Sequence, residues 1–304
     1  MNDTYEGNGL TIAQQLCQEL TALSSGVTGK TLVPVSDYLE PAMKEIDAQL
    51  TGGGVSGLST GFETLDVKLS GLHRGQLIIV SAKTSVGKTA FAGCVAEHIA
   101  RTDPASVLYF SAEMDSTQLV KRMLCREAEV SAFSIDTGHV YNTAAMFNQQ
   151  LAPAAAKLEG IRMWIDHQTQ SINGVASQIR GFALREPVSF VVVDYAQRFR
   201  GTRKKGDTRE MELASIGRDL RWLAVECDVP IMLLAQVNKD GITRESEALE
   251  MDADVVIRLT REPDQTQNTE HAEALVRKQR NGPVGPVPLM FDKSLTKFLN
   301  PAGG

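Results

Sequence analysis

The stretch that decides the fold is SAKTSVGKTA, residues 81–90. Its Gly-Lys-Thr closes the phosphate-binding pattern of a glycine, four residues and Gly-Lys-Ser/Thr, with Ala82 in place of the first glycine. An apolar run, QLIIVSA, leads into it and the helical pattern TAFAGCVAEHIA leads out, which is the context that a phosphate site requires. The sequence therefore predicts a nucleotide site. Ala82 is a mild departure, because not every such loop needs a positive φ at that position.

The loop residues have expected parts in binding. Backbone N–H groups at the helix N-terminus and the helix dipole both favour an anion. Lys88 is expected to neutralise the β- and γ-phosphates, and the Thr89 hydroxyl to hold Mg²⁺. The residues predicted to bind the nucleotide here are Ser85, Val86, Gly87, Lys88, Thr89 and Ala90.

Polar side chains end three other apolar runs. Asp194 closes SFVVVD, where an acidic residue can hold Mg²⁺ through water or be an ordinary strand-end aspartate. Glu113 follows VLYFSA, where a carboxylate can activate the water that attacks a γ-phosphate or be a solvated cap. Gln236 ends IMLLAQ, where it can sense the γ-phosphate or be a simple polar strand end.

Two concentrations of positive charge follow the apolar runs. RFRGTRKKGDTR, residues 198–209, directly follows the Asp194 run, so it predicts a loop at the nucleotide edge that contacts nucleic-acid phosphates, or else a solvated face. Its basic residues are Arg198, Arg200, Arg203, Lys204, Lys205 and Arg209. In RKQRNG, Lys278 and Arg280 alternate along one strand and point to the same side. Spacing alone leaves two uses for them: fingers reaching into a neighbour's site, or surface charges at a hairpin.

From residue 62 onward, short β-branched runs alternate with amphipathic helices, which predicts an α/β fold. The predicted strands are QLIIVSA, SVLYFSAE, IRMWID, SFVVVDY, PIMLLAQV, DVVIRL, EALVRKQR and VPLMFD. We expect a twisted, mostly parallel central sheet flanked by helices. The last two strands join through RNGPVGP, in which Asn281-Gly282 predicts a tight hairpin turn.

The composition limits the class of protein. The chain has 304 residues, 42% of them hydrophobic, enough for one large α/β domain and a small appendage. Its net charge is −6, so nucleic acid must be bound through a local basic patch. The four cysteines form no CxxC pair, and no apolar run is long enough to cross a bilayer. The polar N-terminus is unlike a signal peptide, so a cytoplasmic protein with no membrane contact is expected.

The beginning of the chain differs from the rest. LTIAQQLCQELTAL and DYLEPAMKEIDAQL both have apolar residues at helical spacing. We expect a helical segment over residues 1–50, including a helix over about 37–50, then a glycine-rich connector over 51–61 and the α/β domain over 62–304. The second helix either packs on its own domain or docks on a neighbouring subunit.

Six segments occur in the order of a known family: GLSTGFETLD, LIIVSAKTSVGKTAFA, FSAEMDSTQLVKRML, VVVDYAQ, RESEALEMDADVVI and RKQRNGPVG. Through them, residues 57–299 closely resemble the C-terminal, RecA-like motor domain of DnaB-type replicative DNA helicases. The resemblance implies a P-loop NTPase that forms a hexameric ring, hydrolyses ATP with Mg²⁺ at subunit interfaces and moves 5′→3′ along single-stranded DNA. Two other functions stay open: a RecA/RadA-type ATPase of recombination or repair, and a regulator that binds nucleotide without translocating.

The resemblance also implies residue roles. Glu113 looks like the catalytic base, Gln236 resembles the γ-phosphate sensor, and Arg122 matches an arginine near the nucleotide base. Lys278 and Arg280 resemble the fingers that one subunit gives to the site of the next.

Two loops would line the DNA channel: residues 198–209, and residues 238–250 with Lys239 and Arg244. The helix over about 37–50 is similar in position to the family's linker helix, which packs on the adjacent subunit. The family's N-terminal domain, which contacts primase, has no counterpart in the sequence, so primase binding is in doubt. A helicase loader or another replisome protein is a candidate partner, and the chain is expected to be either a bacterial, phage or plasmid helicase or a truncated one.

Overall fold

The computed structural model describes residues 33–51, 55–138, 143–201, 206, 208–237 and 244–301. The first predicted helix of the chain therefore lies outside the described residues. So do four of the predicted DNA-binding residues, namely Arg203, Lys204, Lys205 and Lys239. Arg244 begins a helix, but its side chain is outside the description.

The chain divides into two compact units, Met1–Gly54 and Val55–Gly304. In the first, α2 spans Ser36–Thr51, which agrees with the helix predicted over 37–50. Asp37 lies in its first turn, where an acidic side chain stabilises the positive end of the helix. The described apolar side chains of α2, among them Leu39, Met43 and Leu50, are exposed.

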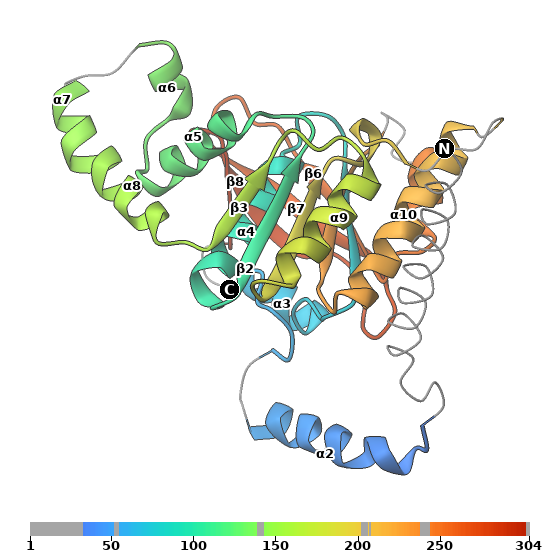
Figure 1. Ribbon diagram of the computed structural model, residues 1–304. Helices are drawn as coiled ribbons and strands as arrows, with labels where there is room; N and C mark the ends of the chain where they lie inside the picture. Colours follow the sequence, from blue (N-terminus) through green and yellow to red (C-terminus); the bar gives the residue numbers. More distant parts are fainter. Residues whose placement is uncertain are drawn as a thin grey trace, which may run out of the picture. The chain divides into compact units, whose positions relative to one another are not determined.

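The second unit is built on one nine-stranded sheet with the order β3-β2-β4-β5-β1-β6-β7-β8-β9. Figure 1 shows this sheet with α9 and α10 in front of part of it. The six strands from β3 to β6 in this order are parallel, and β7, β8 and β9 continue the sheet antiparallel. The strands are β1 Leu77–Ala82, β2 Ser106–Ser111, β3 Met163–Asp166, β4 Val188–Asp194, β5 Ile231–Gln236, β6 Val255–Arg261, β7 Thr269–Gln279, β8 Pro288–Asp292 and β9 Lys297–Leu299. All eight predicted strands are present, and β9 is the one that the sequence did not predict.

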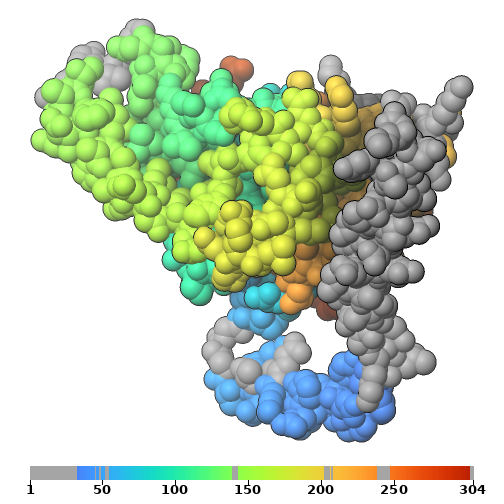
Figure 2. Space-filling view, in the orientation of Figure 1, coloured from blue at the N-terminus to red at the C-terminus, as the bar shows by residue number. Residues whose placement is uncertain are grey.

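Helices cover both faces of the sheet, which is why the central strands are continuous apolar runs. On one face, Val80 of β1 shares a core with Phe91 of α4. On the other, Ile79 shares a core with Ile216 of α10, and α9 forms a large part of the surface that Figure 2 shows in yellow. The helices of this unit are α3 Glu63–Leu69, α4 Lys88–Thr102, α5 Ser116–Glu127, α6 Ala132–Asp136, α7 Thr143–Met146, a π-helix Phe147–Leu151, α8 Ala152–Glu159, α9 Ile172–Ala183, a 3₁₀ helix Ala196–Arg198, α10 Arg209–Glu226 and α11 Arg244–Glu250.

The second half of the predicted connector belongs to the larger unit. Leu58 forms a β-bridge with Leu72, and the Gly57 N–H donates to Ser70 O at 2.8 Å. A Cβ on Gly57 would lie 2.7 Å from Leu72 O, so the two segments can approach this closely only with glycine there.

The predicted tight turn at Asn281-Gly282 is wrong. β7 ends at Gln279 and β8 begins at Pro288, and Val276 still pairs with Gly285, so the connection is wider than two residues. Pro283 and Pro286 have no N–H to extend the ladder toward a tight turn. The chain also leaves β7 along β6, because the Arg280 N–H donates to Asp254 O at 3.1 Å.

Candidate nucleotide site

The loop between β1 and α4 has the backbone of a phosphate cradle. Gly87, the N-cap of α4, has φ +112°, and a Cβ there would meet the Phe298 ring at 3.0 Å. Only glycine satisfies both constraints. Ala82 is the last residue of β1, paired with Gln236 of β5, and its extended backbone suits any L-residue. Position 82 therefore does not need the glycine of the usual pattern.

The loop faces a cavity of ≈ 490 Å³. The cavity brings together most of the predicted nucleotide residues: Ser85, Gly87, Lys88, Thr89, Ala90, Glu113, Arg122 and Gln236. Val86 does not line it and packs partly buried against the core instead. β1, β2 and β5 all end at this edge, and the chain leaves β1 for β2 across two intervening strands, which is where open α/β sheets bind ligands.

One cation and two carboxylates interact across the loop. Burial raises the pKa of Asp194 to about 6, and the Glu113 carboxylate adds to this rise. The Thr89 and Tyr109 hydroxyls oppose it, and Tyr109 Oη donates to Asp194 Oδ2 at 3.1 Å. Burial lowers the pKa of Lys88, while the negative charges of Asp194 and Glu113 act to raise it. A ligand that binds here therefore meets partly desolvated charges, which interact more strongly than charges in water.

The site fits a magnesium ion that is shared with phosphates. Asp194 is fully buried, and its Oδ1 makes no hydrogen bond to a described residue. Such an oxygen is costly to bury unless something binds it, and a metal-bound water at this place would do so. No group of three His, Cys, Asp or Glu side chains in the described chain could hold a metal by itself. Thr89 and Asp194 would thus leave most ligand positions to phosphate oxygens and water, as Mg²⁺ usually has them.

Gln236 is joined both to the phosphate loop and to the segment after β4. Its Nε2 donates to Thr84 Oγ1 at 2.7 Å. Its backbone is held on both sides by Gln197 in the 3₁₀ helix, with Gln197 Nε2 donating to Gln236 O at 2.8 Å and the Gln236 N–H donating to Gln197 Oε1 at 3.1 Å. The predicted sensor is therefore coupled to the start of the basic loop.

The two ends of that loop are anchored to the sheet edge. Arg198 Nε donates to Tyr195 Oη at 3.1 Å, and the Arg200 N–H donates to Gln170 O at 2.8 Å. Arg209 donates to Gln197 O at 2.7 Å and pairs with Glu212 at 2.6 Å, so its guanidinium holds the loop end.

The structure places Lys278 and Arg280 away from the chain's own cavity. Lys278 Nζ donates to Glu250 O at 3.0 Å and to Met251 O at 2.9 Å, at the C-terminus of α11. Arg280 Nη1 pairs with Asp254 Oδ1 at 3.1 Å. Burial lowers the pKa of Lys278, and the positive charge of Arg280 lowers it further. β7 ends at Gln279, so Arg280 follows the strand and does not lie in it as predicted.

The family follows from a match along most of the chain. Residues 57–300 match the model of the DnaB-like helicase C-terminal domain. The chain belongs to this family. The replicative DNA helicase DnaC of Bacillus subtilis (strain 168) is 35% identical to this DnaB-like chain over 264 residues, which cover 82% of this chain and 57% of that protein.

Solved structures agree with this assignment. One that is described as an ATPase domain matches with a TM-score of 0.78 at 28% identity, covering 88% of the DnaB-like chain and 98% of that one. A DnaB-like replicative helicase, described with its interactions with primase, matches with a TM-score of 0.76 at 26% identity. The match covers 97% of this chain and 76% of that one. The resemblance in the sequence and the RecA-like fold are thereby confirmed. The DnaB-like chain spans just over half the length of the curated relative from B. subtilis.

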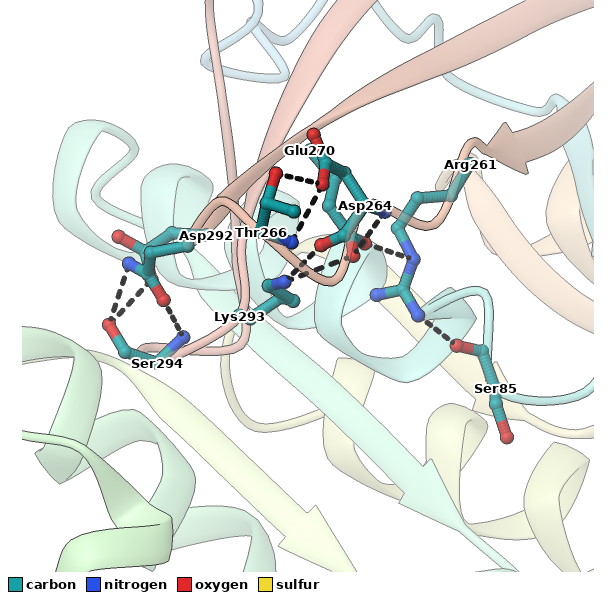
Figure 3. A network of polar contacts seen from close by, with 9 residues as sticks. Ser85, Arg261, Asp264, Thr266, Glu270, Asp292, Lys293 and Ser294 are labelled. Atoms are coloured by element: carbon teal, nitrogen blue, oxygen red, sulfur yellow. Dashed lines mark hydrogen bonds and ion pairs between the residues drawn. The ribbon is translucent and has the colours of Figure 1, made fainter.

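Sequence motifs did not predict one wall of the cavity in this DnaB-like chain. Met114, Arg261, Phe291, Lys293 and Thr296 also line it, and the last four come from β6 and the antiparallel end of the sheet. Figure 3 shows part of this wall, where Arg261 and Lys293 meet Glu270 and Arg261 reaches Ser85 of the loop. The only sequence signal of Arg261, Phe291 and Lys293 is a basic or aromatic residue within or just after an apolar strand, which is common.

No described helix is long and apolar enough to span a membrane.

Proposed function

We propose that this DnaB-like chain is the motor of a replicative DNA helicase, which hydrolyses ATP and moves 5′→3′ on single-stranded DNA. The observation that carries the proposal is the meeting in one cavity of the phosphate loop, Glu113 and Gln236, at the carboxyl ends of β1, β2 and β5. Membership of the DnaB-like family supports it. The proposed location is the cytoplasm of a bacterium, where the protein would serve the replication machinery of the bacterium, of a phage or of a plasmid.

The proposed reaction is the attack of water on the γ-phosphorus of ATP. Glu113 is exposed in the cavity and would orient the water and take its proton. Lys88 would neutralise the charge that develops on the phosphate oxygens. Mg²⁺, bound by Thr89 and through water by Asp194, would supply Lewis-acid stabilisation of those oxygens. Arg122, across the cavity, would contact the nucleotide base.

A second copy of the chain would complete the site. Lys278 and Arg280 lie outside the cavity of their own chain, so they could stabilise the transferred phosphoryl group only in a neighbour's site. A finger of this kind is worth roughly 10³ to 10⁵ in rate. We therefore propose a ring, with six subunits as in the family, that binds ATP between subunits.

Single-stranded DNA would bind in the centre of this ring. The loop over residues 198–209 supplies the basic residues for phosphate contacts, and its link to Gln236 through Gln197 supports communication between nucleotide and DNA. The segment around Lys239 and Arg244 is a second candidate contact. A helicase loader is a proposed partner. One solved relative is described with its interactions with primase, so primase is a further partner to test for this chain.

The other two functions have less support. A RecA/RadA-type recombination ATPase shares the fold, but the family match is to the DnaB-like domain. A regulator that only binds nucleotide would not need a base, a metal-holding carboxylate and fingers, and the chain retains a residue for each role.

The test compares ATP hydrolysis with and without single-stranded DNA, together with unwinding of a 5′-tailed fork. Turnover that DNA stimulates, with unwinding, is expected for the wild type, and both should be lost in Lys88→Ala. Turnover without unwinding would shift support to the recombination ATPase or to a helicase that needs a loader. Nucleotide binding without turnover under any condition would leave the regulator.

A further inference from the structure

The phosphate loop contains a residue in an uncommon backbone conformation. Ser85 has φ +66°, in the left-handed region that glycine adopts freely and other L-residues rarely do. Ser85 lies two residues before Gly87, within the segment whose N–H groups must face the phosphates. A serine here therefore needs support from the surrounding structure to keep the loop in shape.

Arg261, at the end of β6, supplies that support from outside the motif. Its Nη2 donates to Ser85 O at 2.8 Å, so it binds the carbonyl of the residue with the positive φ (Figure 3). The guanidinium also lies 4.3 Å from the centroid of the Phe291 ring, close enough for a cation–π contact. Its side chain is 18% exposed, so the guanidinium itself is held largely within the protein, although Ser85 lies at the surface.

The orientation of Arg261 is fixed by a buried carboxylate. Arg261 Nε lies 3.1 Å from Oε2 of Glu270, whose side chain is 5% exposed. Glu270 Oε1 accepts from the Asp264 N–H at 3.1 Å and pairs with Lys293 Nζ at 3.3 Å. The planar guanidinium can bind a carboxylate with one edge and a carbonyl with another, which a lysine cannot reproduce.

We propose that Arg261 is a positioning residue of the phosphate loop: it holds Ser85 in its left-handed conformation and so prepares the loop for the nucleotide. The inference rests on the proposed nucleotide site. A loop held in its binding shape loses less freedom when ligand arrives, so affinity rises without a new contact to the ligand. Arg261 also lines the cavity, so a direct contact with nucleotide is the competing explanation.

The two explanations differ in their dependence on residue 85. Glycine adopts φ +66° without strain, so a loop with Ser85→Gly should need Arg261 less. A direct contact between Arg261 and the nucleotide would not depend on the residue at that position. Comparison of Arg261→Gln with and without Ser85→Gly therefore separates positioning from contact.

The experiment measures the Kd of a fluorescent non-hydrolysable ATP analogue for the wild-type chain, both single variants and the double variant. Arg261→Gln should raise Kd about tenfold, the order expected for losing a hydrogen bond to a charged group. In the Ser85→Gly background the same change should raise Kd less than about threefold. Hydrogen exchange of the peptide over residues 81–90, without nucleotide, should be faster in Arg261→Gln.

Arg162→Gln is the matched control, because Arg162 pairs with Glu186 at 2.5 Å beside the edge strand β3, and it should change neither Kd nor loop exchange. An equal rise in Kd in both backgrounds would overturn the positioning role in favour of direct contact. Unchanged Kd and exchange in Arg261→Gln, with a wild type that binds nucleotide, would overturn this inference alone. A wild type that binds no nucleotide would overturn the proposed function as well.

Discussion

We expect Asp254 to affect ATP hydrolysis in the proposed site of the neighbouring subunit, although it does not line the cavity of its own chain. This residue is 3% exposed and lies immediately before β6. Its Oδ2 accepts from the Leu77 N–H at 2.9 Å and pairs with Arg221 Nε at 2.7 Å, while Oδ1 pairs with Arg280 Nη1 at 3.1 Å. Asp254 therefore joins the start of the phosphate-loop strand to the proposed finger.

The change Asp254→Asn keeps the side-chain shape and removes the charge. Solvent weakens the pair with Arg280, which is 51% exposed, more than the pair with Arg221, which is 24% exposed. Loss of the charge-assisted contacts should lower the free energy of unfolding by about 2 kcal/mol, mostly through Arg221. A misplaced but present finger should lower kcat roughly tenfold to a hundredfold, less than the roughly 10³ to 10⁵ for removing one.

Urea unfolding and DNA-stimulated ATPase measure these two effects. Arg218→Gln is the matched control, because Arg218 and Asp252 form a 3.9 Å pair with both side chains largely exposed. This control should change stability by less than about 0.5 kcal/mol and leave turnover unchanged.

Mixing of subunits shows whether the effect of Asp254 acts on the neighbour. A subunit with Asp254→Asn has an intact phosphate loop, and one with Lys88→Ala has an intact finger, so a mixed ring contains complete sites. The mixture should hydrolyse ATP faster than the mean of the two variants alone. If Asp254→Asn loses stability but keeps wild-type turnover, or if the mixture never exceeds that mean, the reasoning is refuted.

Three further changes test the site. Because burial raises the pKa of Asp194 from 3.8 to about 6, folding favours its protonated form, and this stabilising contribution is complete below pH 3.8 and lost as pH rises through about 6. Asp194→Asn should thus stabilise the nucleotide-free protein by about 2 to 3 kcal/mol near pH 7.5 and by little near pH 4 in urea unfolding, while abolishing Mg²⁺-dependent turnover. Changing Arg203, Lys204 and Lys205 to Ala should reduce the slope of log affinity for single-stranded DNA against log salt by about 2, and an unaltered slope would remove this loop from the DNA path. Ala82→Gly should leave ATP turnover within about threefold of wild type, whereas a large gain would mean that the alanine distorts the loop.

The parallel strands and the phosphate loop could be predicted because each has a local cause. Strands such as IMLLAQ and SFVVVD are buried on both faces, which makes them continuous apolar runs in the sequence. Gly87 is forced both by its φ and by the Phe298 ring. The failed turn at Asn281-Gly282 shows the limit of such local rules: the prolines around it and the attachment of Arg280 to Asp254 decide the path of the chain.

The other residues that line the cavity could not be predicted, because no local sequence pattern marks them. Arg261 lines it because β6 lies parallel beside β1, and Phe291 lines it because β7, β8 and β9 continue the sheet past β6 in antiparallel fashion and bring β9 against α4. A strand-end arginine or a buried phenylalanine is common in any α/β protein, so neither marks a site until the strand order is known.

The contacts of Lys278 within its own chain suggest a role that its sequence motif does not show. In the single chain, its Nζ binds two carbonyls at the C-terminus of α11, where a cation is favoured by the helix dipole. Those carbonyls end the segment whose earlier residues, around Lys239, are a candidate DNA contact. The ammonium of Lys278 has three N–H donors, and the two carbonyls occupy two of them, so one donor remains for a phosphate oxygen of a neighbouring subunit. If Lys278 serves the proposed site of a neighbouring subunit, the same ammonium would join the nucleotide bound there to the end of α11, and so to the candidate DNA segment that precedes it.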